Sequence, residues 1–401
     1  MMGRVTPRRA LVLVGVVLLA FNLRPAATSV GPLLEEVTTA LGMGDVSTSV
    51  LTTLPVVAFG LFGAAAPALA AVTGMHRLTL LALLAVVVGL LSRALTDSVP
   101  VFLVMSVLAL AGMATANVLL PSLVKLHFPD RTGAVTAAYT TALAIGLTAA
   151  SMATVPLADV GGSWRWGLGA WAVVALLAAV PWLSLVAHDR PGPGPDGGGE
   201  RRTSLRQVAG TRLGWAMALL FGIQSAHAYT IFGWMATMYR DAGFSAATAG
   251  LLLGVATGIT IPTSLWLPAA AARKEDQTRL LLWLIACFPV GYLGLAFAPE
   301  SGAWLWAALL GLGCGVFPVV LTLIGLRSRS HDGTAALSAF TQAAGYVIAA
   351  FGPFGVGLLH DATGGWTWPL VVLAASALVM AALAPGAGRP GTIEAQLEAR
   401  G

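Results

Sequence analysis

The sequence predicts an all-α membrane protein with twelve transmembrane helices. Of its 401 residues, 57% are hydrophobic and only 10% are charged, whereas ordinary soluble domains have about 25% charged residues. A surface with so little charge faces lipid rather than water. The apolar runs are about 20 residues long, which suits helices, because the strands of a membrane β-barrel are alternating segments of about 10 residues.

Each expected helix is an apolar segment between polar residues. The twelve segments cover residues 10–33, 48–71, 78–95, 100–122, 134–157, 165–187, 212–236, 246–270, 279–298, 302–326, 335–359 and 366–385. The basic flank and apolar run at the start resemble a signal peptide. No clear small-residue cleavage site precedes the second segment, so we interpret the first segment as a retained helix.

The longest polar stretch divides these segments into two sets of six. It runs from His188 to Gln207, HDRPGPGPDGGGERRTSLRQ, and its content of Pro, Gly and Arg is typical of a flexible linker. We therefore expect a six-helix bundle over residues 1–187, a cytoplasmic linker over residues 188–211 and a second six-helix bundle over residues 212–401.

The two sets of segments resemble each other at an offset of about 200 residues. Phe21 corresponds to Phe221, Arg24 corresponds to Gln224, and the octapeptide DVGGSWRW corresponds to DATGGWTW. Parallel six-helix repeats, related by an axis along the membrane normal, are a known transporter architecture with the substrate site where the repeats meet. The sequence thus predicts two pseudo-symmetric bundles.

The basic residues predict how the bundles are oriented. If the N-terminus lies in the cytoplasm, eighteen of the 22 Lys and Arg residues fall on the cytoplasmic side and only Arg93, Arg165 and Arg240 fall on the other. This asymmetry follows the positive-inside rule, so we expect both termini in the cytoplasm. Contact with anionic membrane lipid explains the excess of basic residues, and we expect no nucleic-acid partner.

The sequence has no motif for enzymatic or ATP-driven chemistry. Cys287 and Cys314 lie in apolar runs, which favours neither a disulfide framework nor a cysteine metal site. Glycine-rich stretches such as GLGCG lack the Lys and Ser/Thr of a P-loop. An intramembrane enzyme would need a nucleophile, a base or a metal at membrane depth. We therefore expect a protein that is not an enzyme and has no metal or cofactor.

An arginine lies inside the first apolar segment. Arg24 is 14 residues beyond Ala10, which is about 21 Å along a helix and roughly two-thirds of the way through a hydrocarbon core of about 30 Å. All seventeen Asp and Glu residues fall in or beside expected loops, so the sequence offers no carboxylate at membrane depth. A guanidinium there, in a helix broken by Pro25, suits the binding of an anionic substrate by charge-assisted hydrogen bonds.

The alternative for Arg24 is a structural role. Its side chain would then extend toward headgroups or Glu35, or cap carbonyls that Pro25 leaves free. Thr28 lies on the same helix face and is a candidate co-ligand, with a hydroxyl that bonds back to a carbonyl one turn earlier as its alternative. Asn22 also flanks Arg24, but at a spacing that points it elsewhere. We include both as candidate substrate-binding residues.

The seventh segment holds a second polar cluster. Gln224, the repeat mate of Arg24, offers a donor and an acceptor to a small polar ligand, with a hydrogen bond between helices as its alternative. His227 is a candidate proton carrier because it titrates near neutral pH, and a neutral, hydrogen-bonded histidine is the alternative. The further candidates for the substrate cavity are Ser225, Tyr229, Asn117, Tyr139, Gln342 and Tyr346.

Stretches along most of the chain resemble one family of transporters. NLRPAATSVGPLL, residues 22–34, resembles the first-helix signature of the cyanate and nitroimidazole permease family within the major facilitator superfamily. Further similar stretches are LTTLPVVAFGLFG, NVLLPSLVKLHFPDR, AYTTALAIG, GWMATMYRDAGFS, LTLIGLRSRS and LLHDATGGW. The chain departs from the family at Cys314, where members often have Gln, and at WMAT, where they often have a Leu-Pro pair.

The resemblance implies the major facilitator fold and rocker-type alternating access, with spans 1, 4, 7 and 10 lining the cavity. It also implies a small solute, either an anion such as cyanate or a small nitroaromatic, and a bacterial inner membrane. From Arg24 we expect a small anion. The alternative is efflux of small neutral nitroaromatic or drug-like compounds with Arg24 structural. We expect a monomer, and the energy source stays open between proton coupling, exchange and simple facilitation.

Overall fold

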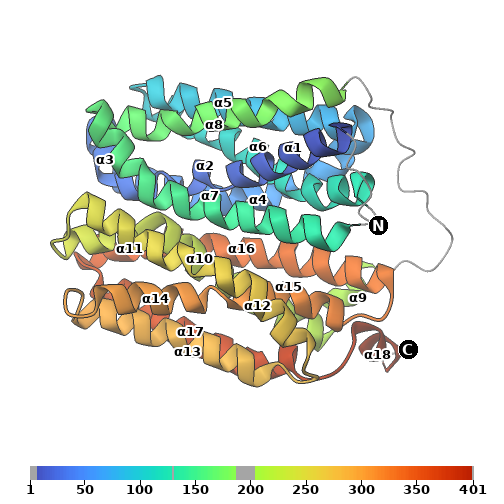
Figure 1. The fold of residues 1–401 in the computed structure, drawn as a ribbon. Coiled ribbons are helices and arrows are strands. Elements are labelled where there is room, and N and C mark those ends of the chain that lie inside the picture. The colour runs from blue at the N-terminus through green and yellow to red at the C-terminus, as the bar shows by residue number, and fades with distance from the viewer. Residues whose placement is uncertain (1–6, 129–130, 187–203, 400–401) are drawn as a thin grey trace. The chain divides into compact units, whose positions relative to one another are not determined.

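The computed structural model of the protein describes residues 7–128, 131–186 and 204–399. All regular secondary structure within these residues is helical, as Figure 1 shows. The expected all-α architecture is therefore confirmed. Residues 188–203 of the expected linker lie outside the described residues. The rest of that segment includes the short helix α9 (Leu205–Ala209), whose N-cap Ser204 forms a capping box with Gln207.

The helices before residue 187 follow the expected apolar segments. Their bounds are α1 (Pro7–Asn22), α2 (Pro25–Thr28), the 3₁₀-helix η1 (Gly31–Leu33), α3 (Leu34–Leu41), α4 (Asp45–Thr73), α5 (Met75–Leu95), α6 (Val99–His127), α7 (Thr132–Gly161) and α8 (Trp164–Leu185). The helices after α9 are α10 (Arg212–Asp241), α11 (Ala246–Gly258), α12 (Thr260–Ala272), α13 (Thr278–Phe297), α14 (Ala303–Gly313), α15 (Val316–Leu326), α16 (His331–Thr363), α17 (Thr367–Gly388) and α18 (Ile393–Glu398).

Eleven helical segments of the described chain are long and apolar enough to cross a membrane. The first of them, Arg9–Leu41, combines α1, α2, η1 and α3. The remaining expected span is α10, which is 30 residues long but carries Gln224, Ser225, His227 and Tyr229 in its middle. All four side chains are buried. Helix α10 therefore has the length of a span, and protein covers the polar residues in its middle.

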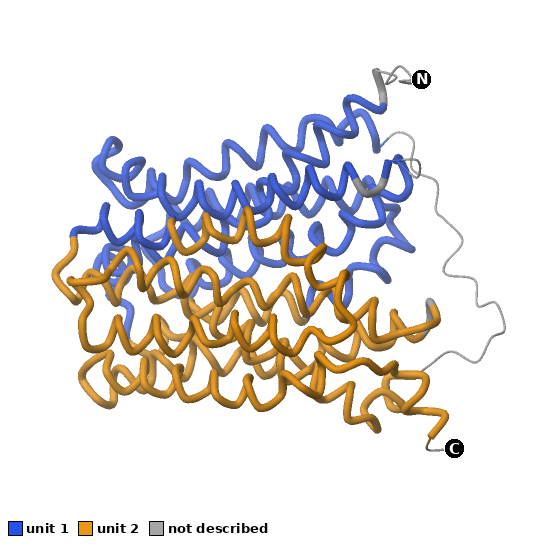
Figure 2. The backbone as a smooth tube through the Cα atoms, turned by 60° about the horizontal axis from the view of Figure 1, so that its bottom comes forward, with its two compact units in different colours: residues 1–44, 61–196, 245–254 blue, residues 45–60, 197–244, 255–401 orange. Residues whose placement is uncertain are grey.

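The helices form two compact units, which Figure 2 colours separately. Unit 1 comprises residues 1–44, 61–196 and 245–254, and unit 2 comprises residues 45–60, 197–244 and 255–401. Within unit 1, α5 packs against α6 and α8, and α1 packs against α7 and α8. Within unit 2, α10 packs against α16 and α17, and α13 packs against α17. The start of α4 thus belongs to unit 2, and the division into residues 1–187 and 212–401 stays a prediction.

Equivalent helix pairs in the two units show the internal repeat. In unit 1, a Cβ on Gly146 of α7 would lie 2.0 Å from the carbonyl oxygen of Phe21 in α1. In unit 2, a Cβ on Gly345 of α16 would lie 2.4 Å from Cδ1 of Phe221 in α10. Only a residue without a Cβ lets membrane helices approach so closely. The offset of about 200 residues in the sequence therefore corresponds to a repeated contact between helices.

Three of the spans are interrupted. The first breaks at Leu23 and Arg24, between α1 and α2, and again at Ser29 and Val30. The eighth breaks at Ile259, between α11 and α12, and the tenth breaks between α14 and α15 at residues 314–315. Breaks of this kind free backbone groups from the helix, and in many transporters they form the substrate or ion site. Arg24 lies at the first break, and Gln224 of α10 lies beside the tenth.

Candidate functional site

Arg24 lies at the break between α1 and α2. Proline lacks an N–H and clashes with the preceding turn, so Pro25 ends one helix and begins the next. Arg24 is the N-cap of α2, and its carbonyl accepts from the N–H groups of Ala27 and Thr28, at 3.0 Å each. The residue falls near the midpoint of the span Arg9–Leu41, and its side chain is half-buried. The break therefore holds a guanidinium in the middle of a membrane span.

The side chains of Thr28 and Asn22 hydrogen-bond to the backbone near this break. The Thr28 hydroxyl donates to the Arg24 carbonyl at 3.1 Å, which is the local bond considered as its alternative. Asn22 Nδ2 donates to the carbonyls of Leu18, at 2.9 Å, and of Val174 in α8, at 3.2 Å. Both side chains are buried. Both side chains thus hydrogen-bond to backbone carbonyls at the break. Their part in substrate binding stays a prediction.

A second arginine meets the same broken span. Arg93, in the last turn of α5, is completely buried. Its Nη1 donates to the Ala26 carbonyl at 3.0 Å and its Nη2 donates to Ser29 Oγ at 3.1 Å. The sequence did not reveal this contact, because an arginine two residues from the end of an apolar segment has the pattern of a flanking charge.

In unit 2, Gln224 lies against the break in the tenth span. Its Nε2 donates to the carbonyl of Cys314, between α14 and α15, at 3.5 Å. The Ser225 hydroxyl donates to Gln224 Oε1 at 3.4 Å. Both side chains are almost fully buried, and both bonds are long. The repeat mate of Arg24 thus also lies beside an interrupted helix, with an amide that is only weakly held.

His227 is enclosed between α10, α13 and α17. Its Nδ1 lies 3.0 Å from the hydroxyl of Tyr292, and its Nε2 lies 3.2 Å from the hydroxyl of Ser376. The imidazole stacks on Phe288 with ring centroids 4.3 Å apart, and the side chain has no exposed surface. Two hydroxyl partners satisfy a neutral imidazole, which donates from one nitrogen and accepts at the other. This arrangement matches the hydrogen-bonded alternative for His227.

Four aromatic rings lie near one another, and we call them the aromatic cluster. Its members are Tyr229, Tyr346, Phe59 and Phe221. The ring centroids of Phe59 and Tyr346 lie 6.1 Å apart, and those of Phe59 and Tyr229 lie 6.4 Å apart. Phe221 meets Tyr346 edge-on at 5.2 Å. These spacings are typical of aromatic pairs that attract one another. The cluster joins the middle of α4, at Phe59, to α10 and α16 within unit 2.

The remaining predicted residues occupy half-buried positions on other helices. Asn117 lies in α6 and Tyr139 in α7, both in unit 1. Gln342 lies in α16, and its Nε2 donates to Ser338 Oγ at 2.9 Å. Asn117 and Tyr139 thus join Arg24 among the candidates in unit 1, whereas Gln342 joins the candidates of unit 2.

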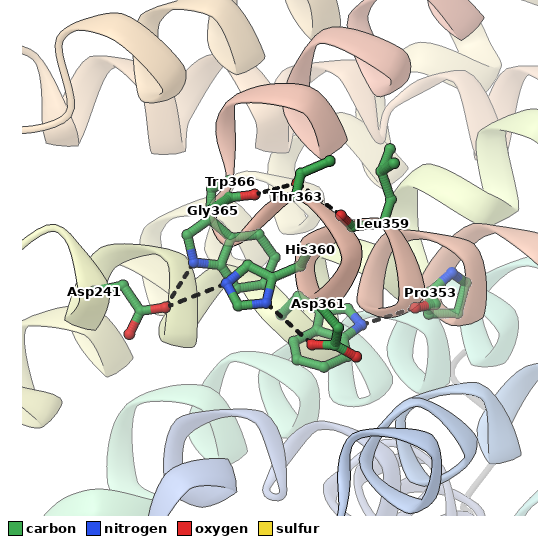
Figure 3. Close-up of polar contacts among 9 residues, drawn as sticks. Asp241, Pro353, Leu359, His360, Asp361, Thr363, Gly365 and Trp366 are labelled. Carbon is green, nitrogen blue, oxygen red and sulfur yellow. Dashed lines mark hydrogen bonds and ion pairs between the residues drawn. The ribbon is translucent and has the colours of Figure 1, made fainter.

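The sequence did not reveal a polar cluster at the ends of α10 and α16 (Figure 3). His360 lies between two carboxylates, with Nδ1 3.3 Å from Asp361 Oδ1 and Nε2 4.0 Å from Asp241 Oδ2. The indole N–H of Trp366 donates to Asp241 at 2.7 Å, and its ring lies 4.1 Å from the His360 ring. Within the described ranges, no set of three or more His, Cys, Asp or Glu side chains could hold a metal ion. The contacts of Asp241 with His360 and Trp366 connect the end of α10 to the end of α16 and to the residue before α17.

Membrane-spanning helices in two repeated units, with polar residues at broken spans, define a membrane transporter. Residues 12–353 match the Major Facilitator Superfamily, and the chain belongs to that superfamily. It is 34% identical to the 2-nitroimidazole transporter of Escherichia coli (strain K12), over 95% of this chain and 96% of that one. It is 30% identical to the cyanate transport protein CynX of the same organism, over 87% and 90% of the two chains.

The fold is also found among solved transporters. The structure is similar to the crystal structure of a bacterial homologue of the human lysosomal transporter Spinster, with a TM-score of 0.75, 16% identity and 98% of both chains covered. The expected fold and the resemblance to cyanate and nitroimidazole permeases are thus confirmed. The protein is a multi-pass membrane transporter rather than an enzyme.

Proposed function

We propose that the protein carries a small anion, of the size and charge of cyanate, across the cytoplasmic membrane by alternating access. The observation that carries this proposal is the position of Arg24, at a helix break near the middle of the first span. An ionisable residue inside the membrane is costly, and in transporters it commonly marks the path of the solute. The relative named as a cyanate transport protein supports the same class of substrate.

The two arginines near the break differ in a way that favours Arg24 as the anion ligand. Arg93 is completely buried and donates to the backbone and to Ser29, whereas the Arg24 side chain is half-buried. A guanidinium offers five N–H donors in a planar arrangement, and charge-assisted hydrogen bonds from it are strong. Gln224 is our candidate for the polar ligand in unit 2, because its weakly held amide can both donate and accept.

The aromatic cluster favours a second candidate function, transport of a small neutral nitroaromatic. Tyr229, Tyr346, Phe59 and Phe221 present ring faces and edges that suit a flat aromatic solute. A relative 34% identical to this chain is named as a 2-nitroimidazole transporter. In this case Arg24 would have a structural role, and removal of its charge would spare transport.

The experiment that separates the two candidates is uptake of cyanate and of 2-nitroimidazole into proteoliposomes. Arg24→Gln should lower the transport efficiency for cyanate by about 10- to 100-fold, the loss expected for a hydrogen bond to a charged group. Arg279→Gln is the matched control, because Arg279 is exposed at the start of α13. Unchanged cyanate transport by Arg24→Gln, with saturable transport of 2-nitroimidazole, would favour the second candidate.

A further inference from the structure

Arg93 is a buried charge whose partners are not carboxylates. Its side chain has no exposed surface, and within the described chain no Asp or Glu lies in ion-pair distance of it. Burial of a guanidinium without a counter-ion is strongly unfavourable unless hydrogen bonds compensate for the lost water. The hydrogen bonds that Arg93 makes to Ala26 and Ser29 both reach the segment around α2. The charged guanidinium of Arg93 is therefore hydrogen-bonded to the interrupted first span.

The two bonds hold the end of α2 that lies opposite to Arg24. In a continuous helix, the carbonyl of Ala26 would accept from the N–H of residue 30. The helix ends at Thr28, and here Arg93 Nη1 donates to that carbonyl while Nη2 holds Ser29 just beyond the helix. Helix α2 is one turn long, so few bonds of its own fix its direction. Arg93 therefore supplies the bond to Ala26 that a continuous helix would have supplied, and it adds a second bond to the side chain of Ser29.

We propose that Arg93 is the positioning residue for Arg24. Arg24 is the N-cap of α2, so the orientation of this single turn sets where its guanidinium lies. A side chain that is free to shift with α2 would lose the geometry that charge-assisted hydrogen bonds to a small anion require. Arg93 thereby determines the affinity for the anion without contact to it. This inference rests on the proposed function of Arg24.

The test uses cyanate as the probe and compares variants of Arg93 and Ser29 in proteoliposomes. Arg93→Lys keeps the charge but cannot reach Ala26 and Ser29 with the geometry of two parallel N–H groups. Ser29→Ala removes only the acceptor of the second bond. We expect each change to raise KM for cyanate about tenfold while the maximal rate stays within about twofold, because the loss is one of ligand geometry.

Arg165→Lys is the matched control. Arg165 also donates to backbone carbonyls, those of Ala94 at 2.8 Å and Thr96 at 3.1 Å, and it pairs with Asp97, but none of these bonds reaches α2. It should leave KM for cyanate unchanged. In an Arg24→Lys background, Arg93→Lys should raise KM much less than it does alone, because residues that act through one another give non-additive effects.

The outcomes separate this inference from the proposed function. If Arg24→Gln leaves KM for cyanate unchanged, both are contradicted. If Arg24→Gln raises KM while Arg93→Lys and Ser29→Ala behave like Arg165→Lys, only the positioning role is overturned. Full additivity of Arg93→Lys with Arg24→Lys would also overturn it. If Arg93→Lys does not fold, Ser29→Ala decides the question, because loss of one hydroxyl leaves the guanidinium and its bond to Ala26 in place.

Discussion

Gly162 and Gly364 end α7 and α16 with the same left-handed backbone, at a φ of +67° in both. They occupy the same fourth position in DVGGSWRW and DATGGWTW. Helices often end at a glycine in this conformation, because a Cβ would crowd the neighbouring carbonyl. The internal repeat therefore includes the backbone conformation of equivalent helix ends as well as the contacts between helices.

Replacement of Gly364 by alanine should destabilise the protein by about 1 kcal/mol, the cost of placing a Cβ on a left-handed residue. The measurement is thermal unfolding of the purified protein. Gly355→Ala is the matched control within α16, because a Cβ at Gly355 would meet open space and its φ is not positive. That control should raise stability by about 0.5 kcal/mol or more, as alanine favours the helix. An equal loss of stability in both variants would show that the left-handed backbone at Gly364 does not require glycine.

The break in the first span could be predicted because its cause lies within the sequence. Pro25 lacks the N–H of a regular helix and disfavours helical backbone in the residue before it, and Arg24 stands out as a charge in an apolar run. The local bond of Thr28 to the carbonyl four residues earlier was also one of the two predicted alternatives. Features that depend on neighbouring residues of one chain segment were thus accessible from the sequence.

Contacts between distant segments could not be predicted in the same way. The partners of His227 are Tyr292 and Ser376, which lie on two other helices. The burial of Arg93 depends on the course of α2, more than sixty residues earlier. A single sequence shows periodicity along one helix, but it does not show which helices pack together. The roles of such residues therefore require the structure.

His227 should contribute to stability and not to the pH dependence of transport. His227→Gln should lower stability by about 1–3 kcal/mol, because the change disturbs two buried hydrogen bonds and a ring stack. Transport measured between pH 5.5 and pH 8, over roughly the range in which histidine titrates, should keep the wild-type profile. Ser376→Ala is the control, since it removes one of the two partners. A flattened or shifted profile in His227→Gln alone would restore its role as proton carrier.

Glu394 in α18 holds the start of α16. Its carboxylate accepts from the N–H groups of Ser330, at 2.9 Å, and Arg329, at 3.0 Å, and from the Ser330 hydroxyl at 2.8 Å. Partial burial raises the pKa of the Glu394 carboxyl, but these hydrogen bonds outweigh it and hold the pKa below its ordinary value of 4.5. The ionised carboxylate is therefore favoured in the folded state.

Stability contributed by Glu394 should be fully present above about pH 4.5 and lost as the pH falls through the lowered pKa of the folded state. Glu394→Gln should cost about 1 kcal/mol at pH 7, a value reduced for the partial exposure of the group. The difference in unfolding temperature between wild type and Glu394→Gln should shrink below pH 4. Glu398→Gln is the control, because its ion pair with Arg329 is exposed and long, at 3.7 Å. A difference that does not depend on pH would contradict this assignment.

Gly146 permits the contact of α7 with α1 beside the Arg24 break. A Cβ at this position would lie 2.0 Å from the carbonyl oxygen of Phe21, so Gly146→Ala must push the two helices apart. We expect the free energy of unfolding, measured by heat or denaturant, to fall by about 1–3 kcal/mol, the range for an overpacked interior. Cyanate transport should fall as well, because Phe21 lies three residues before the proposed anion ligand. Gly63→Ala is the matched control, since its Cβ would lie at an ordinary 3.5 Å from Val118. If Gly146→Ala were as stable and as active as Gly63→Ala, close packing of α1 on α7 would not be needed to position Arg24.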